Sequence, residues 1–265
     1  MSEDLVWYAA YGSNLHRARL DCYLQGGRPH GSSLWHPGCR DPRPPRRHVP
    51  LLLPGRMYFA MESAAWGGGG MAFLDPDGPG SAAGRGYLLT VDQFLDVAAQ
   101  EMRRPPGETP LDLAAALRDG RAVCGLGRYE TLVLAGERDG WPVLTFTAPW
   151  AAGDVPWTRP SAAYLTQLGA GLLEAHGWTP ERIADYLCSR PGAAGNWSRE
   201  AVRALLPEAA DASRAGPGVP GAPLTPDTAG APGGPGGPGG PGAPGGPSAS
   251  GAATAPAPAA RPARP

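Results

Sequence analysis

The chain has 265 residues, with 24 acidic and 23 basic side chains and a formal net charge of −1, so no overall field favours nucleic acid or an anionic membrane. All 23 basic side chains are arginine and none is lysine. The absence of lysine excludes Schiff-base chemistry, lysine-bound pyridoxal phosphate and a phosphate-loop lysine. No stretch approaches the ~20 apolar residues of a membrane span, and no apolar signal segment follows the acidic start, so a cytoplasmic protein is the default expectation.

The composition changes at about Pro207. Beyond this point Gly, Pro, Ala, Ser and Thr dominate, and all aromatic residues lie before it. Such a segment cannot bury enough apolar surface to offset its ordering entropy. We therefore expect one folded domain over residues 1–206 and a disordered tail over residues 207–265. Glycine recurs at every third position from Gly230 to Gly245, but this short, glycine-rich repeat favours a flexible polyproline-II-biased tail over a collagen helix.

The first elements follow from a short apolar run and the turn residues after it. Residues 6–11 predict a buried strand, and Gly12, Ser13 and Asn14 predict a tight turn. Residues 15–24 predict a short helix that ends at Gly26. Residues 28–50, rich in Pro, Gly and Arg, predict an irregular loop.

The remaining pattern predicts strands first and helices later. Four strands are expected at residues 51–53, 56–61, 71–74 and 86–90. Helices are expected at residues 91–102, with Asp92 as the cap, and at 111–117, 161–176 and 180–187. Residues 129–134 and 141–147 predict a hairpin around the turn Asp139-Gly140. This order indicates an α+β fold.

Four motifs, in this order, resemble one known family. Residues 8–15, with the sequence YAAYGSNL, look like the N-terminal signature of the γ-glutamylcyclotransferase family. The run Trp66-Gly67-Gly68-Gly69-Gly70 precedes a strand, the pair Gln100-Glu101 ends a helix, and residues 160–164, PSAAY, begin a later helix. Together the matches cover roughly residues 5–190.

The resemblance implies a fold and a reaction. The fold would be α+β, a small closed barrel of mixed strands flanked by helices. The reaction would be release of 5-oxoproline, formed when the α-amine of a γ-glutamyl group attacks its own γ-carbonyl. The partner would be a small γ-glutamyl compound, with no cofactor and no metal. Glutathione, a γ-glutamyl amino acid, a γ-glutamylamine and a biosynthetic intermediate all remain open as substrates, as does the oligomeric state.

The resemblance also implies roles for particular residues. Glu101 corresponds to the family's acid/base, which takes a proton from the α-ammonium and returns it to the departing amine. The competing interpretation is a solvated carboxylate beside Arg103 and Arg104. The implied substrate contacts are Tyr8, Ala9, Ala10, Tyr11, Gly12, Ser13 and Tyr164.

Physical chemistry adds expectations for the turn and its surroundings. The backbone N–H groups of Gly12 and Ser13 are suited to binding a carboxylate or a developing oxyanion. Gly12 can also adopt unusual backbone dihedrals and lets the substrate approach the backbone closely. Asn14 is interpreted as structural, a cap or a turn holder. Tyr129 matches a family aromatic, although it and Tyr164 could equally be core residues. Residues 102–128 depart from the family as an insertion beside the site, which could reshape the pocket.

Two other functions remain as alternatives. A zinc hydrolase could use Cys22, His36, Cys39 and His48 as ligands, but their spacing matches no known zinc pattern. An inactive binding module of the same fold could contact an anionic partner through Arg40, Arg43, Arg46 and Arg47, although the intervening prolines and Asp41 are typical of a solvated loop.

Overall fold

The computed structural model describes residues 4–29, 34–108 and 111–206. All of them belong to the unit Met1–Asp227. The predicted disordered tail, residues 207–265, lies outside the described residues. Within the described ranges, no helix combines the length and the apolar character needed to cross a membrane.

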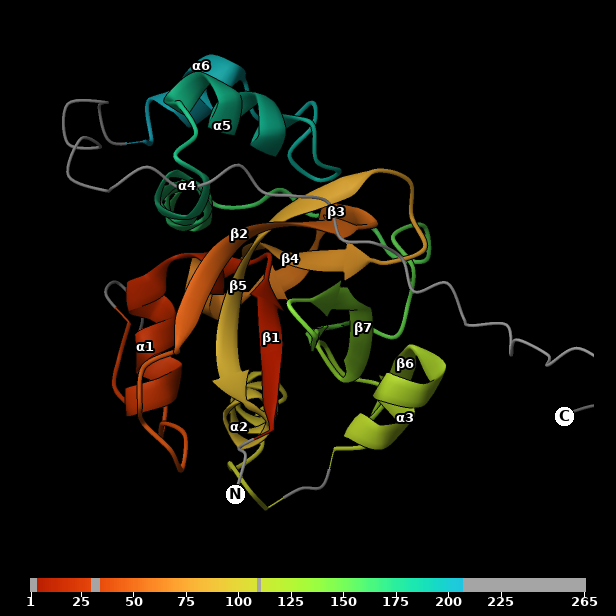
Figure 1. The fold of residues 1–265 in the computed structure, drawn as a ribbon. Coiled ribbons are helices and arrows are strands. Elements are labelled where there is room, and N and C mark those ends of the chain that lie inside the picture. The colour runs from red at the N-terminus through yellow and green to blue at the C-terminus, as the bar shows by residue number, and fades with distance from the viewer. Residues whose placement is uncertain (1–3, 30–33, 109–110, 207–265) are drawn as a thin grey trace, which may run out of the picture. The chain divides into compact units, whose positions relative to one another are not determined.

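A six-stranded mixed sheet forms the centre of this unit (Figure 1). Its strands, in spatial order, are β2 (Arg47–Pro54), β5 (Ser81–Thr90), β1 (Leu5–Ala10), β8 (Trp141–Thr147), β7 (Thr131–Arg138) and β6 (Arg121–Val123). Strand β1 runs antiparallel to β5, with Leu5 opposite Thr90, and parallel to β8. The predicted strand at the N-terminus therefore lies in the interior of the sheet, which fits its apolar sequence.

The predicted closed barrel is not formed by the described residues. The six-stranded sheet ends at β2 and β6, and a second, two-stranded sheet contains β3 (Arg56–Ser63) and β4 (Gly69–Asp75). Strand β2 contains Pro50 and ends at Pro54, and proline cannot donate a ladder hydrogen bond. Since β6 is also only three residues long, both outer strands are suited to an edge rather than to closure.

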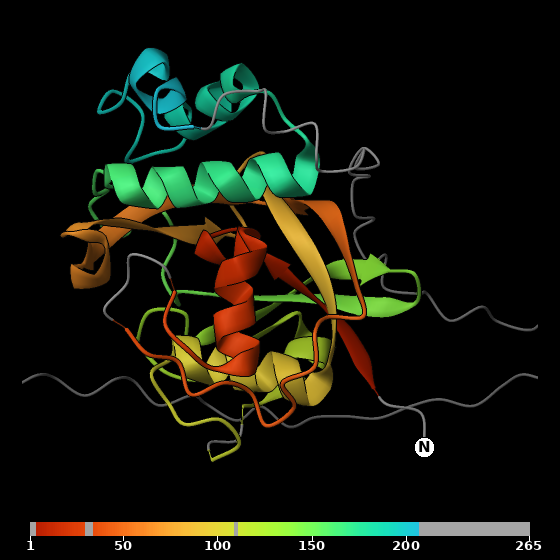
Figure 2. The same cartoon turned by 90° about the vertical axis from the view of Figure 1, so that its left-hand side faces the viewer.

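Helices pack on both faces of the sheet (Figures 1 and 2). Helix α4 (Ala162–His176) crosses one face, with α5 (Pro180–Cys188) and α6 (Arg199–Arg203) beyond it, whereas α1 (Arg17–Gln25) and α2 (Val91–Glu101) lie on the other side. Short 3-10 turns are η1 (Ser13–Leu15) and η2 (Ala64–Trp66), and α3 (Leu113–Asp119) precedes β6. The prediction of an α+β fold with flanking helices is confirmed.

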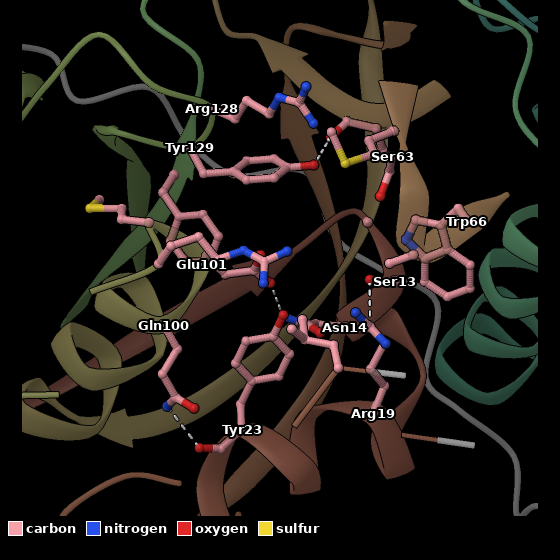
Figure 3. Close-up of a pocket in the computed structure, with 18 of the residues that line it drawn as sticks. Ser13, Asn14, Arg19, Tyr23, Ser63, Trp66, Gln100, Glu101, Arg128 and Tyr129 are labelled. Atoms are coloured by element: carbon pink, nitrogen blue, oxygen red, sulfur yellow. Dashed lines mark hydrogen bonds between the residues drawn. The ribbon is translucent and has the colours of Figure 1, made fainter. Parts of the chain in front are cut away.

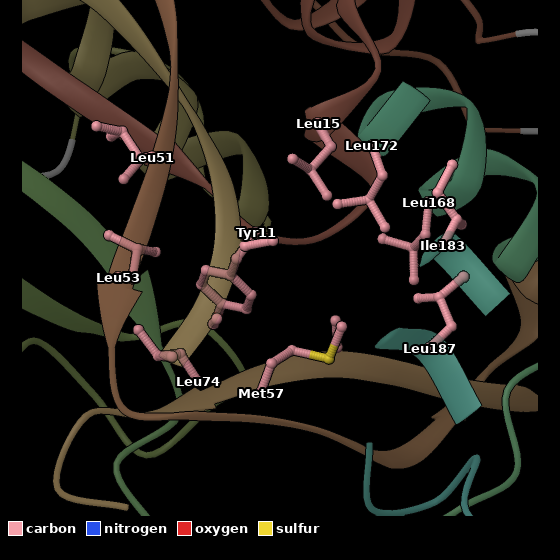
Figure 4. Close-up of a cluster of buried hydrophobic side chains, with 14 of the residues drawn as sticks. Tyr11, Leu15, Leu51, Leu53, Met57, Leu74, Leu168, Leu172, Ile183 and Leu187 are labelled. Atoms are coloured by element: carbon pink, nitrogen blue, oxygen red, sulfur yellow. The ribbon is translucent and has the colours of Figure 1, made fainter. Parts of the chain in front are cut away.

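The side chains of β1 alternate between two hydrophobic clusters, because successive residues of a strand point to opposite faces. Trp7 and Ala9 pack in the cluster that contains the leucines of α4 and α5 (Figure 4). Tyr8 and Ala10 pack in the other cluster, with Phe94 of α2. Burial on both faces explains why β1 has a continuous apolar sequence, and it anchors the turn that follows β1 between two cores.

Local signals explain most element boundaries, with four differences from the sequence prediction. Helix α2 is capped by Thr90 through a capping box with Gln93, not by Asp92. Strand β2 begins at Arg47, inside the predicted loop, because its residues pair along β5. Strand β6 and helix α6 were not predicted. The hairpin is confirmed: Asp139 and Gly140 have φ of 53° and 79°, the left-handed values of a tight hairpin turn.

Candidate active site

A cavity of about 400 Å³ opens beside the end of β1 (Figure 3). Six of the predicted site residues line it: Tyr8, Tyr11, Gly12, Ser13, Glu101 and Tyr164. The other two, Ala9 and Ala10, are at most 1% exposed and belong to the two hydrophobic clusters, not to the lining. Segments distant in sequence, the turn after β1 and the end of α2, therefore meet at one site.

Glu101 reaches the cavity from the last residue of α2. The side-chain amide of Asn14 donates to Glu101 Oε1 at 3.0 Å and to the Tyr8 hydroxyl at 3.1 Å. Asn14 is 3% exposed, and its Oδ1 has no hydrogen-bond partner among the described residues. Asn14 makes no capping hydrogen bond. The structure thus places it beside the carboxylate, a contact that the structural interpretation of Asn14 missed.

Three tyrosines surround the carboxylate and remain protonated at neutral pH. Burial, followed by the Glu101 charge, raises the pKa of Tyr8 and of Tyr23 well above the ordinary phenol value. A hydrogen bond with Glu101 raises the pKa of Tyr23 further. Burial, followed by Tyr164 and Tyr11, also raises the pKa of Tyr129. These phenols can donate hydrogen bonds here but are poor bases, so a proton acceptor at this cavity has to be a carboxylate, and Glu101 and Glu130 both line it.

Tyr164 ties helix α4 to β4 at the cavity. Its hydroxyl accepts a hydrogen bond from Ala72 N at 3.1 Å, and both this donor and the Ser13 backbone act to lower the pKa of the phenol. Burial raises the pKa of Tyr164 to about 12 despite these donors. The Tyr164 phenol therefore lies at the cavity wall close to Ser13, whose N–H is predicted to face an anion.

The backbone of Gly12 is unusual but not left-handed. Its φ is −104° and its ψ is −147°, outside both the left-handed and the usual extended regions. The close approach does remain, since a Cβ at Gly12 would lie 3.4 Å from the Tyr164 hydroxyl and 3.8 Å from Ala72 Cβ. A methyl group therefore fits the fold but occupies space at the cavity wall.

We expect Gly12→Ala to fold like the parent and to bind γ-glutamyl ligands at least ~10-fold more weakly, because the methyl group fills the cavity edge. Thermal unfolding and calorimetric titration measure the two effects. Gly153→Ala is the matched control, because Gly153 is exposed with open space around its Cβ. Parent-like ligand affinity in Gly12→Ala would contradict a role for this turn in binding.

The predicted insertion forms part of the cavity wall. Gly127, Arg128 and Tyr129 line the cavity, and the Tyr129 hydroxyl donates to Ala72 O at 3.0 Å. Tyr129 has φ of 65°, a left-handed value that costs energy for a residue with a side chain. Glu130 braces this segment by accepting from Arg104 and from Gly127 N. The two ends of the predicted insertion, residues 102–128, therefore contribute to the cavity wall, and Tyr129 directly follows it.

Arg19 was not singled out from the sequence, yet it lines the cavity. It is 7% exposed, and its Nε donates to Ser13 Oγ at 2.8 Å. Its guanidinium lies 5.0 Å from the ring centroid of Trp66. A signal existed, because Arg19 shares one helical face with the apolar residues Tyr23 and Leu20. A charged residue on the buried face of a helix is a marker of function.

The residues of the two alternative functions are absent from the cavity lining given by the described residues. Among the described residues, no three His, Cys, Asp or Glu side chains are grouped so as to hold a metal ion. The His36 ring packs on Tyr23, with centroids 3.9 Å apart, and Cys39 donates to Tyr23 O. Of the arginines proposed for an anionic partner, Arg40 pairs with Asp96 and Arg47 with Asp139. These residues dock loops onto the domain.

His36 makes stability depend on pH. Burial first, and then nearby Arg19 and Arg103, lower the pKa of His36 to about 4 from 6.5. As the pH falls through this window, the unfolded chain binds a proton that the folded chain does not, so the free energy of unfolding falls by up to ~1.4 kcal/mol per pH unit. We expect His36→Gln to lose less stability than the parent between about pH 7 and about pH 5 in urea unfolding. Equal losses would show that His36 titrates normally.

Comparison with known proteins gives similarity in sequence to one curated protein and in fold to several structures. No protein-family model matches the chain. Histone deacetylase 5 of Arabidopsis thaliana is 33% identical over an alignment of 201 residues, and the match covers 69% of this chain and 30% of that protein. The chain thus spans about 30% of the length of the curated relative it matches.

The solved structures include a γ-glutamyl cyclotransferase with 16% identity and a TM-score of 0.39, covering 76% of this chain and 98% of that one. An uncharacterized human protein gives 15% identity and a TM-score of 0.39, covering 77% and 98%. A yeast γ-glutamyl cyclotransferase specific to glutathione gives 13% identity and a TM-score of 0.24, covering 76% and 85%. The chain is similar to these structures in fold, and such low scores carry no information on activity.

Proposed function

We propose that the cavity around Glu101 cyclises γ-glutamyl compounds and releases 5-oxoproline. The observation that carries the proposal is the environment of this carboxylate. Two glutamates are among the described residues that line the cavity, and Glu130 is held by Arg104. Glu101 instead forms no ion pair within the described ranges and contacts the buried amide of Asn14. It is therefore positioned to exchange protons with a ligand.

The reaction needs one proton carrier and no water. Glu101 removes a proton from the α-ammonium of the substrate, which frees the nitrogen lone pair. That lone pair attacks the γ-carbonyl carbon and forms the ring C–N bond. As the amide bond to the leaving group breaks, the departing nitrogen takes the proton that Glu101 holds. Glu101 then takes the second proton from the ring nitrogen and passes it to the same leaving amine, which departs as an ammonium while the lactam nitrogen keeps one hydrogen. Because nucleophile and electrophile belong to one molecule, the enzyme mainly has to fold the substrate into its reactive shape.

The surrounding residues suit these steps. Asn14 fixes one oxygen of Glu101, and the neutral phenols of Tyr8 and Tyr23 add hydrogen-bond donors without competing as bases. Tyr164 and Tyr129 both bond the backbone of Ala72, which holds α4 and the segment before β7 against β4. A rigid wall of this kind favours the folded conformer of a flexible γ-glutamyl chain.

A panel of γ-glutamyl compounds tests the proposal. Glutathione, a γ-glutamyl amino acid and a γ-glutamylamine are each incubated with the purified chain, and 5-oxoproline is measured by mass spectrometry. We expect at least one compound to release 5-oxoproline in proportion to enzyme concentration. Binding of these compounds without release would instead make the domain a ligand-binding module of the same fold, and the proposal would fail.

A further inference from the structure

Arg19 is a buried cation without a counter-ion in the described part of the chain. Its side chain is on α1, 7% exposed, and no carboxylate of the described residues lies within ion-pair distance. The contrast with the buried Arg85, which pairs with Glu174, and with the partly buried Arg104, which pairs with Glu130, is clear. Burying an unpaired guanidinium is costly. Its retention at a cavity wall indicates that a ligand supplies the anion.

The two terminal NH₂ groups of the Arg19 guanidinium remain available to bind that anion. Its Nε is occupied by Ser13 Oγ at 2.8 Å, and one face of the group lies over the Trp66 ring. The two terminal NH₂ groups make no hydrogen bond with the described residues, and Figure 3 shows them at the cavity beside Ser13 and Trp66. A guanidinium that is fixed through its Nε and has both NH₂ groups unoccupied can bind a carboxylate through two parallel hydrogen bonds.

Asn14 supplies the complementary half of the receptor. Its buried Oδ1 has no partner among the described residues and can accept a hydrogen bond from an ammonium. Arg19 donates to Ser13, and the next residue, Asn14, donates to Glu101. The positive guanidinium and the negative carboxylate therefore contact neighbouring residues of one turn. An α-amino acid presents an ammonium and a carboxylate on the same carbon, which matches these two neighbouring charges.

We propose that Arg19 binds the α-carboxylate of the γ-glutamyl group, an assignment that rests on the function proposed above. Binding there directs the α-amine toward Asn14 and Glu101, where it loses its proton. The α-carboxylate is common to every γ-glutamyl compound, whatever its leaving group. Arg19 therefore determines recognition of the γ-glutamyl end, and the wall formed by residues 127–129 is left to contact the leaving group.

The first test uses the unmodified chain and two probes that differ only in the carboxylate. The probes are 5-oxoproline and pyrrolidinone, which is the same lactam ring without the carboxylate. Calorimetric titration is expected to give at least ~10-fold tighter binding of 5-oxoproline, because a charge-assisted bidentate pair is lost with pyrrolidinone. This comparison needs no variant, so it stands even if Arg19 substitutions impair folding.

The second test replaces the guanidinium. Arg19→Gln should weaken 5-oxoproline binding at least ~10-fold and leave pyrrolidinone binding unchanged, whereas Arg19→Lys, which keeps the charge but not the fork, should fall between. Arg118→Gln, an exposed arginine on α3, is the matched charge control and should behave like the parent. Circular dichroism confirms the fold of each variant.

Three outcomes would overturn the assignment of Arg19. They are equal binding of the two probes by the parent, binding of neither probe, and parent-like 5-oxoproline affinity in a folded Arg19→Gln variant. Release of 5-oxoproline from the compound panel is measured separately. If release occurs while any of these outcomes is found, the proposed reaction stands and only the role of Arg19 is wrong.

Discussion

Glu101→Gln is expected to lower 5-oxoproline release at least ~100-fold while the domain stays folded. The carboxamide has nearly the same size, and its oxygen can still accept the hydrogen bond from Asn14 Nδ2. It cannot take a proton from the substrate ammonium or return one to the leaving amine. The loss should therefore appear in the single-turnover rate and not in ligand affinity, because binding does not need the proton transfer.

The matched control for this substitution is Glu137→Gln, the same chemical change on an exposed residue of β7. It should leave both the rate and the melting temperature like those of the parent. If Glu101 were only a solvated carboxylate at a helix end, Glu101→Gln would behave in the same way as this control. A folded Glu101→Gln variant with the parent rate would therefore refute the proton-transfer role.

Gly171→Val is expected to destabilise the domain by about 3 kcal/mol and to reduce 5-oxoproline release with it. Gly171 lies on α4, where a Cβ would be 2.5 Å from Leu15 Cβ and 2.7 Å from His16 N. These atoms belong to the turn and helix start after β1, next to Ser13 and Asn14. Any side chain at Gly171 must push α4 and the site turn apart, so packing and activity fail together.

Ala163→Val on the exposed side of the same helix is the control for Gly171→Val. It places the same valine side chain on α4 and carries only the helix-propensity cost of a β-branched residue, about 0.5 kcal/mol. Urea unfolding compares the two variants. Equal stabilities would show that α4 can move away from the turn freely, and that the turn does not depend on this contact.

Local patterns in the sequence were sufficient for the elements that carry the site. The apolar run of β1 and the turn residues after it placed Gly12 at the end of a buried strand. The helical period of α2 placed Glu101 at its end. The Asp139-Gly140 turn fixed the β7–β8 hairpin. Each of these signals lies within one element, where residue spacing and turn chemistry determine the conformation.

The remaining features depend on contacts between distant segments. Asn14 and Glu101 are 87 positions apart, so their hydrogen bond could not be read from either motif alone. Whether the sheet closes into a barrel likewise depends on which strands pair. The prolines of β2 indicate an edge strand only when the pairing of β2 with β5 is known. Ala9 and Ala10 share a motif with the cavity residues, but the alternation of a strand directs them into the two cores.

The most direct test of the proposed reaction follows the oxygen atoms of the product. The parent chain is incubated in water enriched in heavy oxygen with a γ-glutamyl compound that releases 5-oxoproline in the panel. The masses of the products are then measured by mass spectrometry. Intramolecular attack by the amine predicts 5-oxoproline with no heavy oxygen from the solvent, together with the free leaving amine. Free glutamate carrying one heavy oxygen would contradict this account, because it would show that water, not the α-amine, attacks the γ-carbonyl in the cavity beside Glu101.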